Sequence, residues 1–236
     1  MHGLEVKQTY YLKGASRSGK SALALNICDQ ILEQYPDEGV GLYFTLESDR
    51  LQLNLRRISS WTRIPLTRLQ LGNFYDGSDV EKYDWALQRL PKMSLQILDR
   101  SVYQNFERIA SYCENQVLNS HIAFVVIDFL QLCHLRGYQQ SRHLELSKIT
   151  NLINALAKDL NCPILVLSQL NKEQEAKESR DIENNASHVW LITREPEQEV
   201  AEIRGEKGKN IGTWGPVQLR FNRYCQWFKD ERENHE

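Results

Sequence analysis

The chain lacks a paired pattern of cysteines, which argues against two classes of protein. The five residues are Cys28, Cys113, Cys133, Cys162 and Cys225. They are odd in number, widely spaced and form no CxxC pair, which argues against a disulfide framework and against a zinc site. We therefore expect reduced cysteines that are mostly buried as small apolar residues. The six histidines are equally scattered and suggest no metal site.

Long apolar runs and a strong charge imbalance are also missing. No stretch approaches the roughly 18 apolar residues of a membrane span, and residues 1–14 lack the basic and then apolar plan of a signal peptide. We therefore expect no membrane association and a cytoplasmic location. A net charge of −2 argues against a protein that coats nucleic acid by bulk charge. It leaves room for DNA binding by a few local loops.

The chain does have the length of one globular domain with a large core. Its 236 residues suit a single α/β domain. We expect this domain to span residues 1–229. The remaining residues, 230–236, are highly charged and predict a disordered tail.

Four short apolar runs predict buried β-strands. They are Gln8–Leu12, Val40–Leu46, Ile122–Ile127 and Pro163–Leu167. The last three show little alternation, which is typical of strands covered on both faces. Helical stretches are predicted at Ser21–Gln34, Arg50–Ser60, Ser101–Val117 and Leu144–Leu160. Strands that alternate with helices indicate a mostly parallel twisted sheet, flanked by helices and wound by right-handed crossovers.

The pattern changes after Ser168. Residues 171–185 are polar and predict a surface loop or a frayed helix. Three short strands follow, at Val189–Ile192, Val200–Ile203 and Val217–Phe221. We expect them to form a C-terminal antiparallel meander that finishes the sheet.

The most specific local motif is a phosphate loop. Residues 14–21 fit GxxxxGK[ST] in full, after a predicted strand and at the start of a predicted helix. Its glycines let backbone N–H groups fold around phosphates, and the helix N-terminus adds partial positive charge. Lys20 is expected to reach the β- and γ-phosphates of ATP, and the Ser21 hydroxyl to ligate Mg²⁺. The predicted nucleotide-binding residues are Gly14, Ala15, Ser16, Arg17, Ser18, Gly19, Lys20 and Ser21.

Two acidic residues at strand ends are candidates for the rest of the chemistry. Asp128 ends an apolar strand, where a carboxylate can hold Mg²⁺ beside the phosphates. The next residue is Phe129 rather than the glutamate that many P-loop ATPases use to activate water. Glu47 ends another strand and could polarise that water instead. A salt-bridged or capping glutamate is the alternative interpretation.

The amide of Gln169 ends a fourth predicted strand. An amide at this edge of the sheet can hydrogen-bond the γ-phosphate or the water, and so report hydrolysis to the adjoining loop. Taken alone, an ordinary strand-to-loop glutamine would be the better interpretation.

These pieces, in this order, resemble the C-terminal RecA-like motor domain of DnaB-type replicative DNA helicases. The resemblance runs from about Gly3 to Phe228. It includes YFTLES (43–48), RLQLG (68–72), VVIDFLQL (125–132), ITNLINALAKDLNCPILVLSQLNK (149–172), DIENNASHVWLITRE (181–195) and VQLRFN (217–222). The IDFLQL and ALAKDLNCPILVLSQLN runs are much more specific than a phosphate loop alone.

The resemblance implies a hexameric ring with ATP between neighbouring subunits and single-stranded DNA in a central channel. It places the water-activating glutamate at Glu47, the magnesium aspartate at Asp128 and the sensor glutamine at Gln169. The family also sends a lysine and an arginine into the neighbour's ATP site. Lys207 matches the lysine, but Lys209 stands where the arginine is expected and lacks its planar bidentate geometry. The alternative for this pair is a lysine-rich exposed turn.

Candidate DNA contacts follow two of the strands. They are Arg136, Arg142 and Lys148 after Asp128, and Lys172, Lys177 and Arg180 after Gln169. Residues 171–180 carry three basic and three acidic side chains. Because grooves that track a phosphate backbone normally need net positive charge, we expect weak, salt-sensitive binding of single-stranded DNA.

The sequence therefore predicts an ATP-dependent DNA helicase or translocase motor that works in a ring. The alternative is a DnaB-related ATP-binding regulatory or assembly protein without intrinsic unwinding activity. We expect the family's N-terminal helical domain and linker helix to be missing, and a separate replication protein is a candidate partner that replaces them. Lys209 and the charge-balanced loop favour the alternative, whereas the intact nucleotide motif favours the enzyme.

Overall fold

The computed structural model describes residues 4–170 and 184–230. Within these ranges, nine strands form one sheet in the order β3-β2-β4-β5-β1-β6-β7-β8-β9. The strands are β1 Thr9–Gly14, β2 Val40–Thr45, β3 Leu95–Leu98, β4 Ile122–Asp128, β5 Ile164–Gln169, β6 His188–Thr193, β7 Val200–Gly208, β8 Trp214–Asn222 and β9 Trp227–Asp230. The helices are α1 Lys20–Gln34, α2 Arg50–Thr62, α3 Leu66–Leu71, α4 Gly77–Arg89, α5 Phe106–Val117 and α6 Arg142–Asp159. Short 3-10 turns lie at η1 Leu90–Lys92, η2 Ser101–Gln104 and η3 Leu130–Leu132.

The strands from β3 to β6 along the sheet are all parallel. Their carboxyl ends therefore meet at one edge, which brings motifs that are far apart in the sequence together. Thr45 lies opposite Asp128, and Gly14 lies opposite Gln169. The predicted mostly parallel sheet is confirmed, and its carboxyl edge is where a ligand is expected in such folds.

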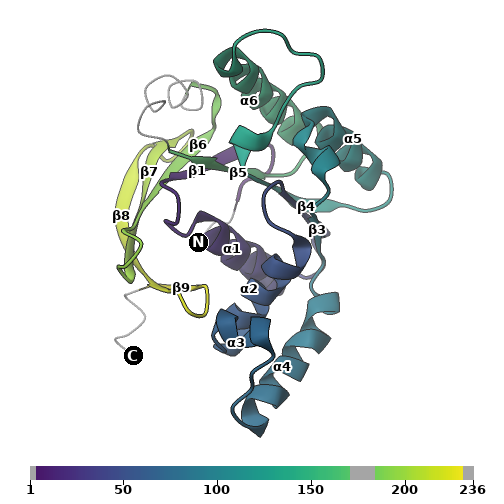
Figure 1. The fold of residues 1–236 in the computed structure, drawn as a ribbon. Helices are drawn as coiled ribbons and strands as arrows, with labels where there is room; N and C mark the ends of the chain where they lie inside the picture. Colours follow the sequence, from purple (N-terminus) through teal and green to yellow (C-terminus); the bar gives the residue numbers. More distant parts are fainter. Residues whose placement is uncertain (1–3, 171–183, 231–236) are drawn as a thin grey trace.

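The C-terminal strands β6 to β9 pair in antiparallel fashion, as predicted. Two details differ from the expected meander. β6 is itself parallel to β1, so it continues the central sheet, and a fourth strand, β9, follows β8. Figure 1 shows these strands curving away from the central sheet until β9 returns towards α1. The Phe228 backbone N–H donates to the Asn26 side chain at 2.9 Å, which ties β9 to that helix.

The core has two layers because both faces of the parallel sheet are covered. Figure 1 shows α5 and α6 on one side of the sheet and α1 and α2 on the other. Along β4, Val125 and Ile127 pack in the first layer, whereas Phe124 and Val126 pack in the second. Burial on both faces explains why the predicted strands show no apolar–polar alternation. The five cysteines are free and buried, as expected.

Several elements differ from the sequence-based expectation. The helix predicted at Ser101–Val117 is broken, because Asn105 caps a new helix: its side chain accepts from the Arg108 N–H at 3.1 Å. β3, α3, α4 and β9 were not predicted. β3 has four residues, of which Ile97 alone is fully buried, and among the α4 residues Ala86 alone is buried. Among the described residues, no helix is long and apolar enough to cross a bilayer.

Candidate nucleotide site

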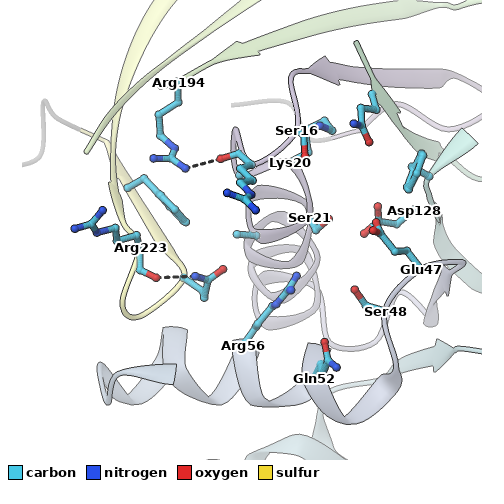
Figure 2. Close-up of a pocket in the computed structure, with 17 residues that line it drawn as sticks. Ser16, Lys20, Ser21, Glu47, Ser48, Gln52, Arg56, Asp128, Arg194 and Arg223 are labelled. Carbon is cyan, nitrogen blue, oxygen red and sulfur yellow. Dashed lines mark hydrogen bonds between the residues drawn. The ribbon is translucent and has the colours of Figure 1, made fainter. Parts of the chain in front are cut away.

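A cavity of about 620 Å³ opens at the carboxyl edge of the parallel sheet. Figure 2 shows it between the start of α1, the end of β4, the side of α2 and the β8–β9 turn. Of the predicted site residues, the cavity is lined by Ser16, Arg17, Gly19, Lys20, Ser21, Glu47, Asp128 and Gln169. Gly14, Ala15 and Ser18 belong to the same loop but do not line the cavity.

The phosphate loop joins the end of β1 to the start of α1. Gly19 takes a left-handed conformation with φ of 101° at the N-terminus of α1, which favours glycine. Gly14 is needed for space, since a Cβ there would lie 2.7 Å from the Ser18 hydroxyl oxygen. The sequence therefore folds here into a close turn that leads directly into a helix N-terminus, a ready-made anion site.

Lys20 turns its ammonium back onto this loop. Its Nζ donates to the carbonyl oxygens of Gly14 and Ala15, each at 2.8 Å. Burial lowers the pKa of Lys20 to about 8, against the opposing effects of the Asp128 and Glu47 carboxylates. The hydrogen-bond partners of the Lys20 ammonium are thus two neutral carbonyls, and the oxygens of a phosphate would fit the role that these carbonyls fill.

Asp128 is buried at the end of β4 and is surrounded by donors. The Tyr43 hydroxyl donates to its Oδ2 at 2.7 Å. Burial raises the pKa of Asp128, and hydrogen bonds to Tyr43 and Ser21, with the charges of Lys20 and Arg56, oppose that rise. A buried carboxylate beside the Ser21 hydroxyl is a suitable pair of oxygen ligands for a hard cation such as Mg²⁺.

No group of three or more His, Cys, Asp or Glu side chains forms a metal cage among the described residues. A magnesium ion held through one carboxylate, one hydroxyl and phosphate oxygens does not require such a cage. The donor set at Ser21 and Asp128 therefore fits a metal that arrives with a nucleotide.

Glu47 and Gln169 complete the edge of the cavity. Glu47 follows the end of β2 and lines the cavity together with Asp128, and both carboxylates act on the pKa of Lys20 (Figure 2). Glu47 does not cap α2, because that role belongs to Asp49, whose side chain accepts from the Gln52 N–H at 2.7 Å. Glu47 is exposed to the cavity, where a carboxylate can polarise a water molecule.

Gln131, which the sequence analysis did not single out, fixes the end of β5. Its Nε2 donates to the Ser168 hydroxyl at 3.0 Å and to the Gln169 carbonyl at 3.1 Å. Its Oε1 accepts from the Gln169 backbone N–H at 3.2 Å. Gln169, at the end of β5, is thus hydrogen-bonded to Gln131 of η3, and η3 follows soon after Asp128 at the end of β4. A displacement at the end of one strand can therefore be passed to the end of the other.

Three arginines of the cavity were also missed: Arg56, Arg194 and Arg223. Arg56 lies one helical turn after Gln52 on α2, and both side chains line the cavity. That spacing of four residues, starting soon after Glu47, is a signal that could have identified Arg56. The charge of Arg56 partly opposes the rise in the pKa of Asp128 that burial causes.

Arg194 is 8% exposed and holds the phosphate loop from behind. Its guanidinium donates to the carbonyl oxygens of Arg17 at 2.6 Å and Ser18 at 3.3 Å. It also donates to the carbonyls of residues 195, 196 and 198, at 3.1, 2.9 and 2.8 Å. Its carbon lies 4.7 Å from the centre of the Phe221 ring. No local motif predicts this role, since Arg194 and Arg17 are far apart in the sequence.

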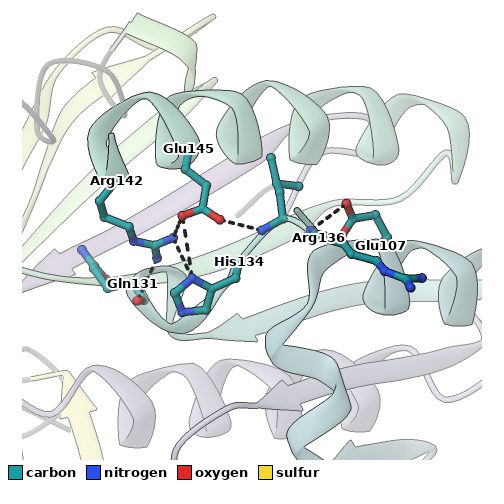
Figure 3. A network of polar contacts seen from close by, with 7 residues as sticks. Glu107, Gln131, His134, Arg136, Arg142 and Glu145 are labelled. Atoms are coloured by element: carbon teal, nitrogen blue, oxygen red, sulfur yellow. Dashed lines mark hydrogen bonds and ion pairs between the residues drawn. The ribbon is translucent and has the colours of Figure 1, made fainter. Parts of the chain in front are cut away.

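The predicted DNA contacts differ in their surroundings, and of the three after Asp128, Arg136 and Lys148 are exposed. Arg142 is half-buried, and Figure 3 shows its guanidinium engaged with Glu145, His134 and the Gln131 carbonyl, the last at 2.9 Å. This internal network gives Arg142 a structural role. Arg136 keeps an exposed side chain, while its backbone N–H donates to Glu107 at 3.2 Å. Lys172, Lys177 and Arg180 lie outside the described residues.

Lys207 and Lys209 do not line this cavity. The Lys209 N–H donates to the Ser187 carbonyl at 3.0 Å, just before β6, and β6 runs parallel to β1. Lys209 is therefore level with the start of β1, about five residues or roughly 16 Å from the end that carries the phosphate loop. The pair cannot reach the chain's own phosphate loop, so any action on a nucleotide has to be on that of a neighbour.

Comparison with known families gives one match over almost the whole chain. The model of the DnaB-like helicase C-terminal domain matches residues 1–230. The replicative DNA helicase DnaB of Pasteurella multocida is 29% identical over 238 residues, which are 93% of this chain and 50% of that protein. The DnaB of Buchnera aphidicola subsp. Baizongia pistaciae is 27% identical over 256 residues, or 98% of this chain and 53% of that protein. The chain spans about half the length of these curated relatives.

Two solved structures show the same fold. A DnaB-like replicative helicase, described with its interactions with primase, has a TM-score of 0.85 at 21% identity over 96% of this chain and 58% of that one. The ATPase domain of another protein has a TM-score of 0.84 at 20% identity over 95% of this chain and 84% of that one. The predicted RecA-like α/β fold of a helicase ATPase domain is confirmed.

Proposed function

We propose that this chain, which belongs to the DnaB-like helicase C-terminal domain family, is an ATP-hydrolysing motor that moves on single-stranded DNA. The observation that carries the proposal is one cavity that joins Lys20, Ser21, Glu47 and Asp128 at the carboxyl edge of the sheet. The intact cavity supports the enzyme over an ATP-binding regulatory protein without a motor activity.

ATP binding is assigned to the phosphate loop. The N–H groups of the loop at the N-terminus of α1 and the Lys20 ammonium would donate hydrogen bonds to the β- and γ-phosphates. Ser21 and Asp128 would hold Mg²⁺, which would supply positive charge beside the phosphates. Arg56 and Arg223, which line the same cavity, add positive charge around the nucleotide.

Hydrolysis needs a base and a connection to the rest of the molecule. Glu47 orients and polarises the attacking water, since it is exposed in the cavity near Asp128. Gln169 senses the γ-phosphate, and Gln131 passes its displacement to η3 through the hydrogen bonds described above. Arg136, exposed beyond η3, is then placed to contact DNA in a loop that responds to hydrolysis.

Assembly is the second half of the proposal. Lys207 and Lys209 lie at the end of the sheet away from the chain's own phosphate loop, which supports action in trans within a ring, proposed as a hexamer. We further propose a cytoplasmic location. A separate replication protein can complete an assembly in which this chain is the motor.

A steady-state assay tests the proposal. The wild-type chain is expected to hydrolyse Mg·ATP and to do so faster with single-stranded oligothymidylate. Lys20→Ala and Glu47→Gln are each expected to lower kcat by at least about 100-fold, because phosphate binding or water activation is lost. Lys82→Ala, at an exposed position of α4, is the matched control and keeps the wild-type rate.

Two outcomes contradict the proposal in different ways. If DNA leaves the ATPase rate unchanged and no ring forms with Mg·ATP, the translocase is excluded while the ATPase stands. If Glu47→Gln retains full activity, the base is a different residue.

A further inference from the structure

A second cavity lies at the opposite end of the sheet from the nucleotide site. It has a volume of about 330 Å³ and is lined by residues from the start of β1, the end of α6, the segment before β6 and the end of β7. Within the part of the chain that the structure describes, its lining includes four lysines, Lys7, Lys158, Lys207 and Lys209, and no carboxylate. We refer to it as the lysine pocket.

The walls of the lysine pocket are held by a hydrogen-bond network across these elements. The Thr9 hydroxyl donates to Asn154 Oδ1 at 2.6 Å and accepts from the Ser187 N–H at 3.2 Å. Asn154 Nδ2 donates to the Asn185 carbonyl at 2.5 Å. Together with the Lys209–Ser187 bond, these contacts fix the backbone that carries the lysines. The pocket is thus a built feature rather than a chance gap between loops.

The charge of the lysine pocket identifies the chemistry of its ligand. Lys7, Lys158 and Lys209 are exposed, and Lys207 is half-buried with its Nζ donating to the Asn184 carbonyl at 3.3 Å. Lys158 lies in the last turn of α6. The three exposed ammonium groups of Lys7, Lys158 and Lys209 repel one another in this concave site, so the arrangement favours a polyanion that neutralises them. A triphosphate carries the compensating charge and offers acceptors to lysine donors.

We propose that Lys7 and Lys158 join Lys207 and Lys209 in one phosphate-binding site, which acts on the nucleotide held by the phosphate loop of a second copy of this chain. This inference rests on the proposed function and extends it to two residues outside the expected lysine–arginine pair. Because Lys209 lacks the bidentate geometry of an arginine, the extra ammonium groups supply the positive charge that one planar group would otherwise provide.

The positions of the two cavities favour a second copy as the source of the phosphate. The lysine pocket faces away from one end of β1, and the carboxylate-bearing nucleotide cavity opens at the other end. In a head-to-tail assembly of identical chains, opposite ends of the subunit meet, and repetition of that contact closes a ring. The four lysines of one copy then face Glu47, Asp128 and the bound phosphates of the next, which are complementary in charge.

A mixing experiment separates this site from a merely structural role. Lys7→Ala, Lys158→Ala and the double variant are assayed for Mg·ATP hydrolysis without DNA, with Lys82→Ala as control. We expect the double variant to lose about tenfold in kcat, with circular dichroism unchanged, because charge stabilisation of the phosphates is weakened. Adding Glu47→Gln chains, which keep an intact lysine pocket but lack the base, should restore activity to the phosphate loops of the double variant.

Three results overturn the inference. Unchanged kcat in the Lys7 and Lys158 variants excludes it, and so does a loss that Glu47→Gln chains fail to restore. Loss of binding to labelled oligothymidylate in the absence of ATP, with kcat unchanged, assigns the pocket to nucleic acid instead. A wild-type chain without ATPase activity removes the proposed function as well, whereas normal activity in all lysine variants removes this inference alone.

Discussion

In the ligand-free protein, the surroundings of Lys20 disfavour the charged form of its side chain. Its pKa is lowered to about 8 because it is buried with carbonyl partners rather than phosphates. In the free protein above that pH, the amine is mostly neutral. A bound triphosphate favours the ammonium, so nucleotide binding is coupled to proton uptake.

Calorimetry in buffers of different ionisation enthalpy measures this uptake directly. We expect binding of a Mg²⁺-bound, non-hydrolysable ATP analogue to the wild-type chain to take up close to one proton at about pH 9 and much less at about pH 7, where Lys20 is already mostly charged. Equal uptake at the two pH values would show that the pKa of Lys20 is not the cause.

The lowered pKa of Lys20 also makes the stability of the folded protein depend on pH. The pKa of Lys20 is lower in the folded protein than its ordinary value, so the unfolded chain binds more protons between the two values. Stability from this group therefore rises as pH increases from about 8 towards 10. Lys20→Met is expected to raise the thermal midpoint of the ligand-free protein at neutral pH, and the gain should shrink in alkaline buffer.

Arg194 is a positioning residue, and its five hydrogen bonds to carbonyls make a specific prediction. Arg194→Lys keeps the charge, but one ammonium cannot span the carbonyls of Arg17 and Ser18 together with those of residues 195, 196 and 198. We expect Kd for ADP to rise about tenfold, a loss of ~1.4 kcal/mol, without loss of helix content. Arg108→Lys, on an exposed face of α5, is the control. An unchanged Kd would show that the loop holds its shape without this contact.

At the scale of elements, Glu145 stabilises the segment that connects β4 to α6 and that includes Gln131. Figure 3 shows its carboxylate between Arg142, His134 and the Leu135 N–H, which donates at 2.7 Å. Burial acts to raise the pKa of Glu145, but the Leu135 N–H, Arg142 and His134 outweigh it and lower that pKa. The ionised carboxylate thus stabilises the connection above the ordinary glutamate pKa, and the contribution is lost as pH falls through the lowered value.

Glu145→Gln tests this connection. The substitution removes the charge but keeps the shape, and we expect a loss of about 1–2 kcal/mol in the free energy of unfolding at neutral pH. The difference from wild type should vanish in acid, where wild-type Glu145 is protonated too. Urea denaturation at a series of pH values, from neutral down through the lowered pKa of Glu145, measures this difference. A loss that persists unchanged in acid would assign the effect to packing rather than to charge.

Particular elements show what the sequence could and could not predict. β2, β4 and β5 are buried apolar runs, so their type and approximate bounds follow from composition alone. β9 was missed because it is short and its partner contacts, such as Phe228 to Asn26, span most of the chain. The phosphate loop, Glu47 and Asp128 have local signatures and meet as expected in one cavity. Arg194 has no local sequence signature, since the phosphate loop that it contacts is distant in the sequence and becomes its neighbour only after folding.

At the scale of the whole molecule, the nucleotide cavity and the lysine pocket lie at opposite ends of the sheet, so the chain is a unit with two different ends. Oligomerisation is therefore expected to depend on nucleotide. Mass photometry should show rings for Glu47→Gln with Mg·ATP, because that variant binds without hydrolysing, and smaller species for Lys20→Ala under the same conditions. Rings of equal abundance in both variants would show that assembly does not need the bound phosphates.

β1 connects the two ends of this unit. All six of its residues are buried, and it is paired on both sides, by β5 and β6. A strand in that position cannot gain or lose one residue without turning its side chains to the wrong faces. Over evolutionary time, the segment from Lys7 to Gly14 should therefore keep a constant length among homologues. Insertions and deletions should accumulate instead around α3 and α4, where Figure 1 shows the chain projecting away from the sheet.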